Sequence, residues 1–286
     1  MHGGRSLKKF SGVLSPVLTP FTKDLKPDSR RLIKQCRWLL SQNVALAVFG
    51  TTSEANSLAL EEKISLLDDL IEAGIDPALF MPGTGCCSLT ETVQLTTHAV
   101  ELGCQGVLML PPFYYTDATE DGLFRSYAET IERVGDNGLK IYLYDIPRFA
   151  GVSISLGLIE RLITQYPDVI VGIKDSTGNW ENTQSILERK WDDFKVFCGS
   201  ETFLLQTMRA GGSGCISATV NINASAIHNL YKAWESNEAD DLQQQLNQVR
   251  QTVEAYPMIP ALKSVVSYHS KDPDWSIVRP PFISLE

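Results

Sequence analysis

The chain has 286 residues, 43% of them hydrophobic and 21% charged, so it can bury a large core and is too long for a small disulfide-held domain. Asp and Glu outnumber Lys and Arg by 34 to 25, and the net charge of −9 argues against a nucleic-acid binder or a protein docked on an anionic membrane. We find no apolar run of about 18 residues, the length that spans a bilayer, and no signal-peptide pattern in the basic first ten residues.

Eight short apolar runs alternate with longer amphipathic segments along most of the chain. In chain order, the runs cover residues 12–21, 44–52, 78–85, 106–115, 140–147, 169–176, 195–201 and 214–219. Continuous runs of Val, Ile and Leu of this length predict strands that are buried on both faces, as in a parallel sheet.

The intervening segments carry the start signals of helices. Asp28 precedes one helical pattern, Ser88 and Glu91 have the spacing of a capping box before the next, and Ser155 and Asn179 open two more. Each interval is therefore suited to the helical crossover that joins neighbouring parallel strands.

Eight strands that alternate with helices predict an α/β fold, a closed (β/α)8 TIM barrel, over residues 1–223. An open doubly wound sheet remains the alternative, because a count of strands does not prove closure. Neither G-x-G-x-x-G after a strand nor G-x-x-x-x-G-K-[ST] occurs, so the usual nucleotide-binding signatures are missing. Over residues 224–286 the strand pattern stops, and we expect a C-terminal helical extension that packs on the barrel.

The cysteines and histidines do not form a metal-binding pattern. The six cysteines show no C-x-x-C pair and no zinc spacing, and the four histidines share no local motif. We therefore expect reduced thiols, most of them in the core of a cytoplasmic protein, and no metal site.

A TIM barrel carries its active site at the C-terminal ends of its strands, so the polar residues that end the apolar runs are the candidates. Lys174 ends the run 169–173, where a lysine is rarely found. Loss of solvation there favours the neutral amine, which is the nucleophile of Schiff-base catalysis. The alternative is a structural lysine that reaches the rim to pair with Asp175 or Glu201.

Tyr144 and the turn 50–54 are the next candidates. Tyr144 ends the run before that of Lys174 and could relay protons during imine formation, or it could simply be a core aromatic residue. In the turn, backbone N–H groups and the hydroxyls of Thr51 and Thr52 can hold a carboxylate, although a capped strand-to-helix turn explains the same residues.

Taken together, these residues resemble the dihydrodipicolinate synthase / N-acetylneuraminate lyase family of pyruvate-dependent class I aldolases. The motifs occur in order over nearly the whole chain: GTTSE at 50–54, GTG at 83–85, PPFYY at 111–115, YDIP at 144–147, GIKDSTGN at 172–179 and GGSGCISATVN at 211–221. The resemblance implies a homotetramer built as a dimer of dimers, with no metal and no organic cofactor.

The resemblance also implies roles for individual residues. Lys174 forms the Schiff base with the keto carbon of pyruvate, and Tyr144 gives and takes protons there. Thr51 links Tyr144 to Tyr115, which reaches in from a neighbouring subunit. The backbone amides of Thr51 and Thr52, with the Thr52 hydroxyl, bind the carboxylate of pyruvate.

Other residues are expected to face the substrate. The resemblance implies that the carbonyl of Ile216 faces pyruvate, and we expect substrate contacts from Arg148, Ser176 and Glu201. The synthases carry an arginine two residues after the proline of Y-x-x-P, and this chain has Phe149 at that position, with Arg148 one residue earlier. The sialic-acid lyases carry an acidic pair after the seventh strand, of which this chain has only Glu201.

These observations predict a Schiff-base lyase that cleaves a 2-keto acid to pyruvate and an aldehyde, or runs the reverse reaction. A 2-keto-3-deoxy sugar acid or a hydroxy-2-oxo acid fits the missing synthase arginine. The alternatives are 4-hydroxy-tetrahydrodipicolinate synthase, which condenses pyruvate with aspartate semialdehyde, a dehydratase of deoxy-keto sugar acids, and a barrel that binds a keto acid without catalysis.

Overall fold

The computed structural model describes residues 9–285, and its centre is one parallel sheet of seven strands in the order β2-β1-β7-β6-β5-β4-β3. The strands are β1 (Gly12–Ser15), β2 (Ala45–Leu46), β3 (Val107–Met109), β4 (Ile141–Asp145), β5 (Ile170–Asp175), β6 (Lys195–Cys198) and β7 (Gly214–Ile216). Each strand lies inside one of the apolar runs that predict strands. The remaining run, 78–85, lies between β2 and β3 and takes the place of an eighth strand.

The segment 80–84 closes the sheet into a barrel. Phe80 bridges to Leu46 of β2, and Gly83 bridges to Leu108 of β3, both in parallel orientation. Backbone bonds continue this pairing, from the amide of Gly83 to the carbonyl of Val48 at 2.7 Å and from that of Thr84 to Leu108 at 3.0 Å. The TIM barrel is therefore confirmed, and the open sheet is wrong.

Glycine is required in this closing segment for a steric reason. A Cβ at Gly83 would collide with the carbonyl oxygen of Phe49, and a Cβ at Gly85 would collide with the backbone of Leu110. The GTG motif thus lets residues 80–84 approach the strands on both sides.

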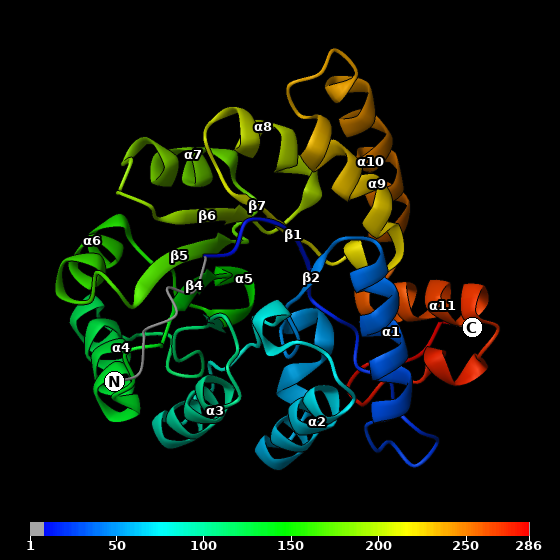
Figure 1. The fold of residues 1–286 in the computed structure, drawn as a ribbon, viewed down its shortest axis with the longest axis horizontal. Coiled ribbons are helices and arrows are strands. Elements are labelled where there is room, and N and C mark those ends of the chain that lie inside the picture. Colours follow the sequence, from blue (N-terminus) through cyan, green and yellow to red (C-terminus); the bar gives the residue numbers. More distant parts are fainter. Residues whose placement is uncertain (1–8, 286) are drawn as a thin grey trace.

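Helices cover the outside of the barrel (Figure 1). They are α1 (Ser29–Ser41), α2 (Leu60–Glu72), α3 (Leu89–Glu101), α4 (Glu120–Val134), α6 (Leu156–Gln165), α7 (Trp180–Glu188) and α8 (Leu204–Arg209). The short α5 (Pro147–Ala150) follows β4 directly and lies inside this ring of helices, over the middle of the barrel (Figure 1). The predicted caps form, since the side chains of Asp28, Ser88, Ser155 and Asn179 accept backbone N–H groups from the first turns of α1, α3, α6 and α7.

The C-terminal part is helical, with α9 (Val220–Ala233), α10 (Ala239–Glu254) and α11 (Met258–Ser270). It lies along one side of the barrel, where α9 contacts β1 (Figure 1). Leu18 of the barrel joins Leu262 of α11 and Trp275 in a separate hydrophobic cluster. The backbone of α9 is kinked at Asn223, and we propose this kink as the boundary between the barrel (1–223) and the extension (224–286).

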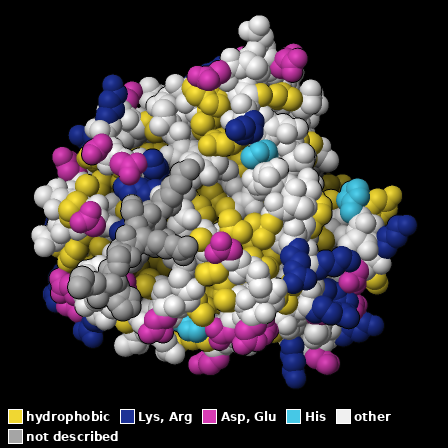
Figure 2. Space-filling view, viewed as in Figure 1, with side chains coloured by type: hydrophobic (Ala, Val, Ile, Leu, Met, Phe, Trp, Pro, Cys, Tyr) yellow, Lys and Arg dark blue, Asp and Glu magenta, His cyan; other side chains and the backbone are white. Residues whose placement is uncertain are grey.

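Within residues 9–285, no helix is long and apolar enough to cross a membrane. All six cysteines are unpaired, and four of them are buried. Lys and Arg side chains gather over α1 on the face in Figure 2, but Arg31 of this helix is neutralised by Asp28, Asp272 and Asp274 at 2.6–2.9 Å.

Candidate active site

Lys174 projects from β5 into the barrel. Every residue of this strand is buried, and Lys174 is only 4% exposed. Its neighbour Asp175 points the other way, toward α7, where it accepts hydrogen bonds from Asn182 at 3.2 Å and Thr183 at 2.5 Å. Because successive side chains of a strand alternate between faces, Lys174 faces the barrel interior.

Tyr144 lies directly beside Lys174. The two residues are paired in the register of β4 and β5, and the Nζ of Lys174 is 4.2 Å from the centre of the Tyr144 ring. This contact places the amine of Lys174 against the face of the Tyr144 ring.

A layer of aromatic side chains fills the barrel interior. Tyr142 is fully buried, its hydroxyl accepts the amide of Phe10 at 2.8 Å, and its ring packs edge-on against Phe10 and Phe197. A Cβ at Gly172 would lie 2.7 Å from the Tyr142 ring, which explains the glycine two residues before Lys174. Since Tyr142 precedes Tyr144 on the same face of β4, this layer lies on the N-terminal side of Lys174 and leaves the amine near the C-terminal mouth.

Thr51 connects the turn after β2 to this pair. It opens the 3-10 helix η1 (Thr51–Ser53), and its Oγ1 lies 3.1 Å from the hydroxyl of Tyr144. Thr52 beside it is buried. The structure thus brings together three of the four predicted catalytic side chains, those of Lys174, Tyr144 and Thr51.

The backbone of this turn is held by buried polar contacts. The Ser53 hydroxyl accepts the amide of Gly50 at 3.2 Å, and the Ser53 carbonyl accepts the hydroxyl of Thr19 at 2.7 Å. In this turn Glu54 has the left-handed backbone conformation, with φ of 56°, whereas Ser53 does not. A buried ion pair with Lys263 holds Glu54 in that conformation, and its carboxylate also accepts the amide of Arg279 at 3.0 Å.

Tyr115, the fourth predicted catalytic residue, lies apart from the other three. It is 72% exposed, and its ring packs edge-on against that of Tyr114. In the described part of the chain, the hydroxyl of Thr51 therefore contacts Tyr144 but not Tyr115.

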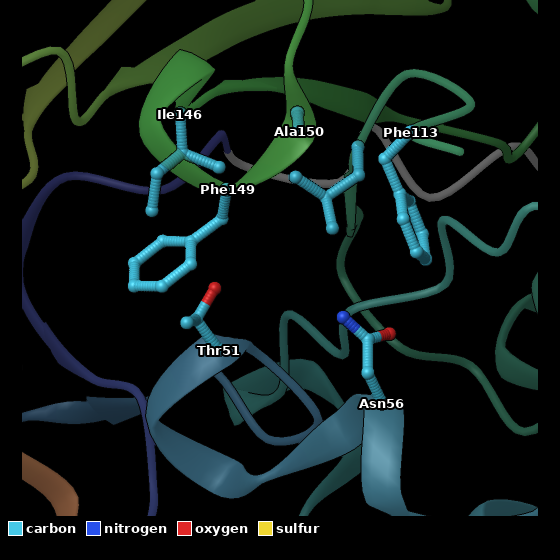
Figure 3. A pocket seen from close by; sticks show the side chains of 7 residues that line it. Thr51, Asn56, Phe113, Ile146, Phe149 and Ala150 are labelled. Carbon is cyan, nitrogen blue, oxygen red and sulfur yellow. The ribbon is translucent and has the colours of Figure 1, made fainter. Parts of the chain in front are cut away.

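A small pocket with a volume of about 50 Å³ adjoins Thr51. Phe149 points toward Thr51 from one side, and Phe113 lies across the pocket from it (Figure 3). Its lining comes from η1, the 3-10 helix η2 (Ala55–Ser57), the segment after β3, and α5 with the residue before it: Thr51, Asn56, Leu110, Phe113, Ile146, Phe149 and Ala150. Sequence reasoning missed five of these residues, although three of them fall in or beside the PPFYY and YDIP motifs: Asn56, Leu110, Phe113, Ile146 and Ala150.

Arg148 and Phe149 have different surroundings. Phe149 lines the pocket, whereas Arg148 is absent from the lining and lays its guanidinium 5.3 Å from the centre of the Phe149 ring. The position of the synthase arginine therefore presents an aromatic ring to the pocket.

Glu201 is buried beside the strand ends rather than open to solvent. Its carboxylate accepts the hydroxyls of Ser217 and Thr219 and pairs with Arg250 of α10 at 3.3 Å. Its oxygens are thus occupied by this chain's own groups. Neither Glu201 nor Asp175 pairs with Lys174 in the part of the chain that the structure describes, so the alternative of a structural ion pair is wrong.

The remaining predicted substrate residues lie at the C-terminal ends of β7 and β5, the two strands on either side of β6. Ile216 is the last residue of β7, and the amide of Ser176 donates to the carbonyl of Asp145 at 2.8 Å. A Cβ at Gly199 would collide with the side chain of Ser176, so this glycine leaves room for it. The substrate contacts of Ile216 and Ser176 stay predictions.

A buried carboxyl group, that of Asp145, lies on the outer face of the sheet where β4 pairs with β5. Asp145 is paired in register with Asp175 and accepts the amide of Ile154 at 3.2 Å. Burial, together with the nearby charge of Asp175, raises the pKa of Asp145 to about 7. No group of three His, Cys, Asp or Glu residues within 9–285 is arranged to hold a metal ion.

Comparison with known proteins gives a consistent result. The sequence profile of the Dihydrodipicolinate synthetase family matches residues 9–286. A 4-hydroxy-tetrahydrodipicolinate synthase of Methanococcoides burtonii is 36% identical over 240 residues, which cover 82% of this chain and 79% of that protein.

Solved structures agree with this match. The dihydrodipicolinate synthase of Agrobacterium tumefaciens superposes with a TM-score of 0.88 at 29% identity, and the match covers 97% of this chain and 94% of that one. A prophage protein of the dihydrodipicolinic acid synthase family from E. coli K12, solved in complex with pyruvate, gives 0.86 at 27% identity with the same coverage.

Proposed function

Because this chain belongs to the dihydrodipicolinate synthetase family, as its motifs predict, we propose that Lys174 is the amine with which it forms a Schiff base with pyruvate. The enzyme is a pyruvate-dependent lyase of the class I aldolase type. The placement of Lys174 carries the proposal, since its amine is buried in the barrel and lies over the ring of Tyr144.

The proposed reaction begins with attack of the Lys174 amine on the keto carbon of a 2-keto acid, and one water leaves as the imine forms. The hydroxyl on C4 then gives up its proton and becomes the carbonyl of the departing aldehyde, while the protonated imine accepts the electron pair of the bond between C3 and C4. Protonation of the enamine at C3 and addition of one water release pyruvate and the free amine. In the reverse direction, pyruvate adds to an aldehyde.

The other residues have supporting roles in this proposal. Tyr144 moves the proton during imine formation, because its hydroxyl bonds Thr51 and its ring contacts Lys174. The backbone of η1, with the Thr52 hydroxyl, binds the carboxylate of pyruvate. Since the imine itself accepts the electron pair, the reaction requires neither a metal nor an organic cofactor.

A second candidate is the synthase reaction with aspartate semialdehyde. The 36% identity with the Methanococcoides burtonii synthase favours it. Phe149 in the pocket opposes it, because a phenyl ring cannot pair with the carboxylate of that substrate. A lyase that acts on a 2-keto acid is therefore the better supported reaction.

We further propose a homotetramer and a cytoplasmic location. Tyr114 and Tyr115 lie exposed and side by side near the pocket, which supports a subunit contact there. Six unpaired cysteines, four of them buried, support a reducing compartment.

Reduction with borohydride in the presence of pyruvate tests the assignment of Lys174. We expect one stable reduced pyruvyl group on the peptide that carries Lys174, measured by mass spectrometry, and no adduct in Lys174→Ala. Lys140→Ala is the matched control, because Lys140 precedes β4 at the opposite end of the barrel. An unlabelled wild-type protein, or label on another lysine, would refute the assignment.

A further inference from the structure

The pocket beside Thr51 has a consistent chemical character. Five of its seven lining residues are apolar, and Phe113, Phe149, Leu110 and Ile146 are the large ones. The polar groups in the lining are the Thr51 hydroxyl and the Asn56 amide, and none of the seven side chains carries a charge. Phe149 and Phe113 face the pocket from two sides in Figure 3.

The pocket is next to the reactive pair. Thr51 is part of both, since it lines the pocket and its hydroxyl lies 3.1 Å from that of Tyr144, whose ring contacts Lys174. A molecule in the pocket is therefore one side chain away from Tyr144. This is where the part of a substrate beyond its pyruvate unit can be accommodated.

Arg148, which adjoins Phe149 in the chain, does not supply a charge to the lining of this pocket. The guanidinium of Arg148 lies against the ring of Phe149 and is not among the lining groups. A carboxylate or several hydroxyls placed between Phe113 and Phe149 would lose water without gaining enough partners, which disfavours such substrates. An apolar group there is favoured, because its surface leaves water and contacts two aromatic rings.

We propose that the aldehyde partner of this enzyme is an apolar one, aromatic or branched aliphatic, and that Phe149 and Phe113 select it. This inference rests on the proposed function of Lys174. In the synthetic direction, C3 of the enamine forms a bond to the aldehyde carbon, and the aldehyde oxygen takes a proton to become a hydroxyl. Hydrolysis of the imine then releases a 4-hydroxy-2-oxo acid and restores the amine.

The test is an aldehyde panel assayed with pyruvate and the full-length protein. Benzaldehyde and isobutyraldehyde represent the apolar class, glyceraldehyde the polyhydroxylated class and aspartate semialdehyde the carboxylated class. We expect kcat/KM for the apolar aldehydes to exceed that for the other two by about 10-fold or more, the discrimination expected when polar groups lack partners.

Two variants make the test specific to the pocket. Phe149→Arg should reverse the preference toward aspartate semialdehyde, because it places a cation where the ring now lies. Phe149 is 60% exposed, so the fold does not depend on its ring. Tyr268→Arg is the matched control, because Tyr268 is an exposed aromatic residue of α11 outside the pocket lining. The aldehyde preference of this variant should equal that of the wild type.

The outcomes separate this inference from the proposed function. A wild-type protein that forms the pyruvate adduct on Lys174 but prefers glyceraldehyde or aspartate semialdehyde overturns the apolar subsite alone. So does an adduct without faster consumption of the apolar aldehydes, or an unchanged preference in Phe149→Arg. Failure to form the adduct overturns the proposed function itself.

Discussion

At the scale of single residues, one phenol joins the two halves of the candidate site. The hydroxyl of Tyr144 meets Thr51 at 3.1 Å, and its ring contacts the amine of Lys174. A group in this position can exchange a proton with a substrate bound to the lysine, and the threonine hydroxyl can orient it.

We expect Tyr144→Phe to slow the exchange of the C3 protons of pyruvate by roughly 10²-fold or more, because general acid–base groups commonly contribute that much. The exchange is measured by NMR in deuterated water and needs no aldehyde. Tyr166→Phe is the control, since the Tyr166 hydroxyl bonds Glu132 on the surface. Unchanged exchange in Tyr144→Phe would make Tyr144 a core aromatic residue with no part in catalysis.

At the scale of elements, the β4–β5 pair has two faces with different chemistry. The inner face carries Tyr144 and Lys174, and the outer face carries Asp145 and Asp175 in the next register position. Asp175 is bound by the amide of Thr177 and by two α7 side chains, and it remains the better partnered carboxylate. Asp145 has less compensation, which is why burial raises its pKa to about 7.

This raised pKa predicts how stability depends on pH. Between about pH 4 and pH 7 the folded protein keeps a proton on Asp145 that the unfolded chain has released. The contribution of Asp145 to the free energy of unfolding therefore falls as the pH rises through that range. The side chain introduced by Asp145→Asn is neutral at every pH, so this variant should not lose that part of its stability as the pH rises. We expect its Tm at pH 8 to exceed that of the wild type by several degrees, with a smaller difference at pH 4.

Thermal unfolding followed by circular dichroism at pH 4 and pH 8 measures this effect. Asp24→Asn is the control, because Asp24 is exposed in a surface turn and should shift neither Tm. If the Tm of Asp145→Asn and the Tm of the wild type change equally between the two pH values, Asp145 does not keep its proton in the folded protein.

At the scale of the whole molecule, the C-terminal part is anchored at the catalytic turn. Lys263 of α11 forms a fully buried ion pair with Glu54, donates to the carbonyl of Ile277 at 2.8 Å and lies 4.3 Å from the centre of the Phe21 ring. Arg279 adds a pair with Glu62 of α2. The extension thereby braces the turn that carries Thr51 and Thr52.

Assembly is the prediction that belongs to this scale. We expect sedimentation velocity to show a tetramer, and we expect the double variant Tyr114→Arg, Tyr115→Arg to dissociate it, because two buried cations at a contact are unfavourable. Tyr268→Arg, which changes an exposed aromatic residue on α11, should leave the assembly intact. A monomeric wild-type protein would contradict the proposed role of this surface.

Much of this architecture is determined by the sequence alone. Apolar runs that recur with helical segments between them specify parallel strands joined by crossovers, because both faces of such strands must be buried. Tyr144 and Lys174 lie one residue before the C-terminal ends of the neighbouring strands β4 and β5. Parallel strands end at one edge, so the proximity of the two residues follows from the same pattern. The ordered motifs identify the family, which the profile match confirms.

Other features were decided only by the tertiary structure. Closure depends on residues 80–84 lying between β2 and β3, which no count of runs can show. Phe149 lines the pocket and Arg148 does not. The carboxylate of Glu201 is bound by Ser217, Thr219 and Arg250. These outcomes depend on side-chain directions and on contacts between segments far apart in the chain, and a local pattern of residues specifies neither.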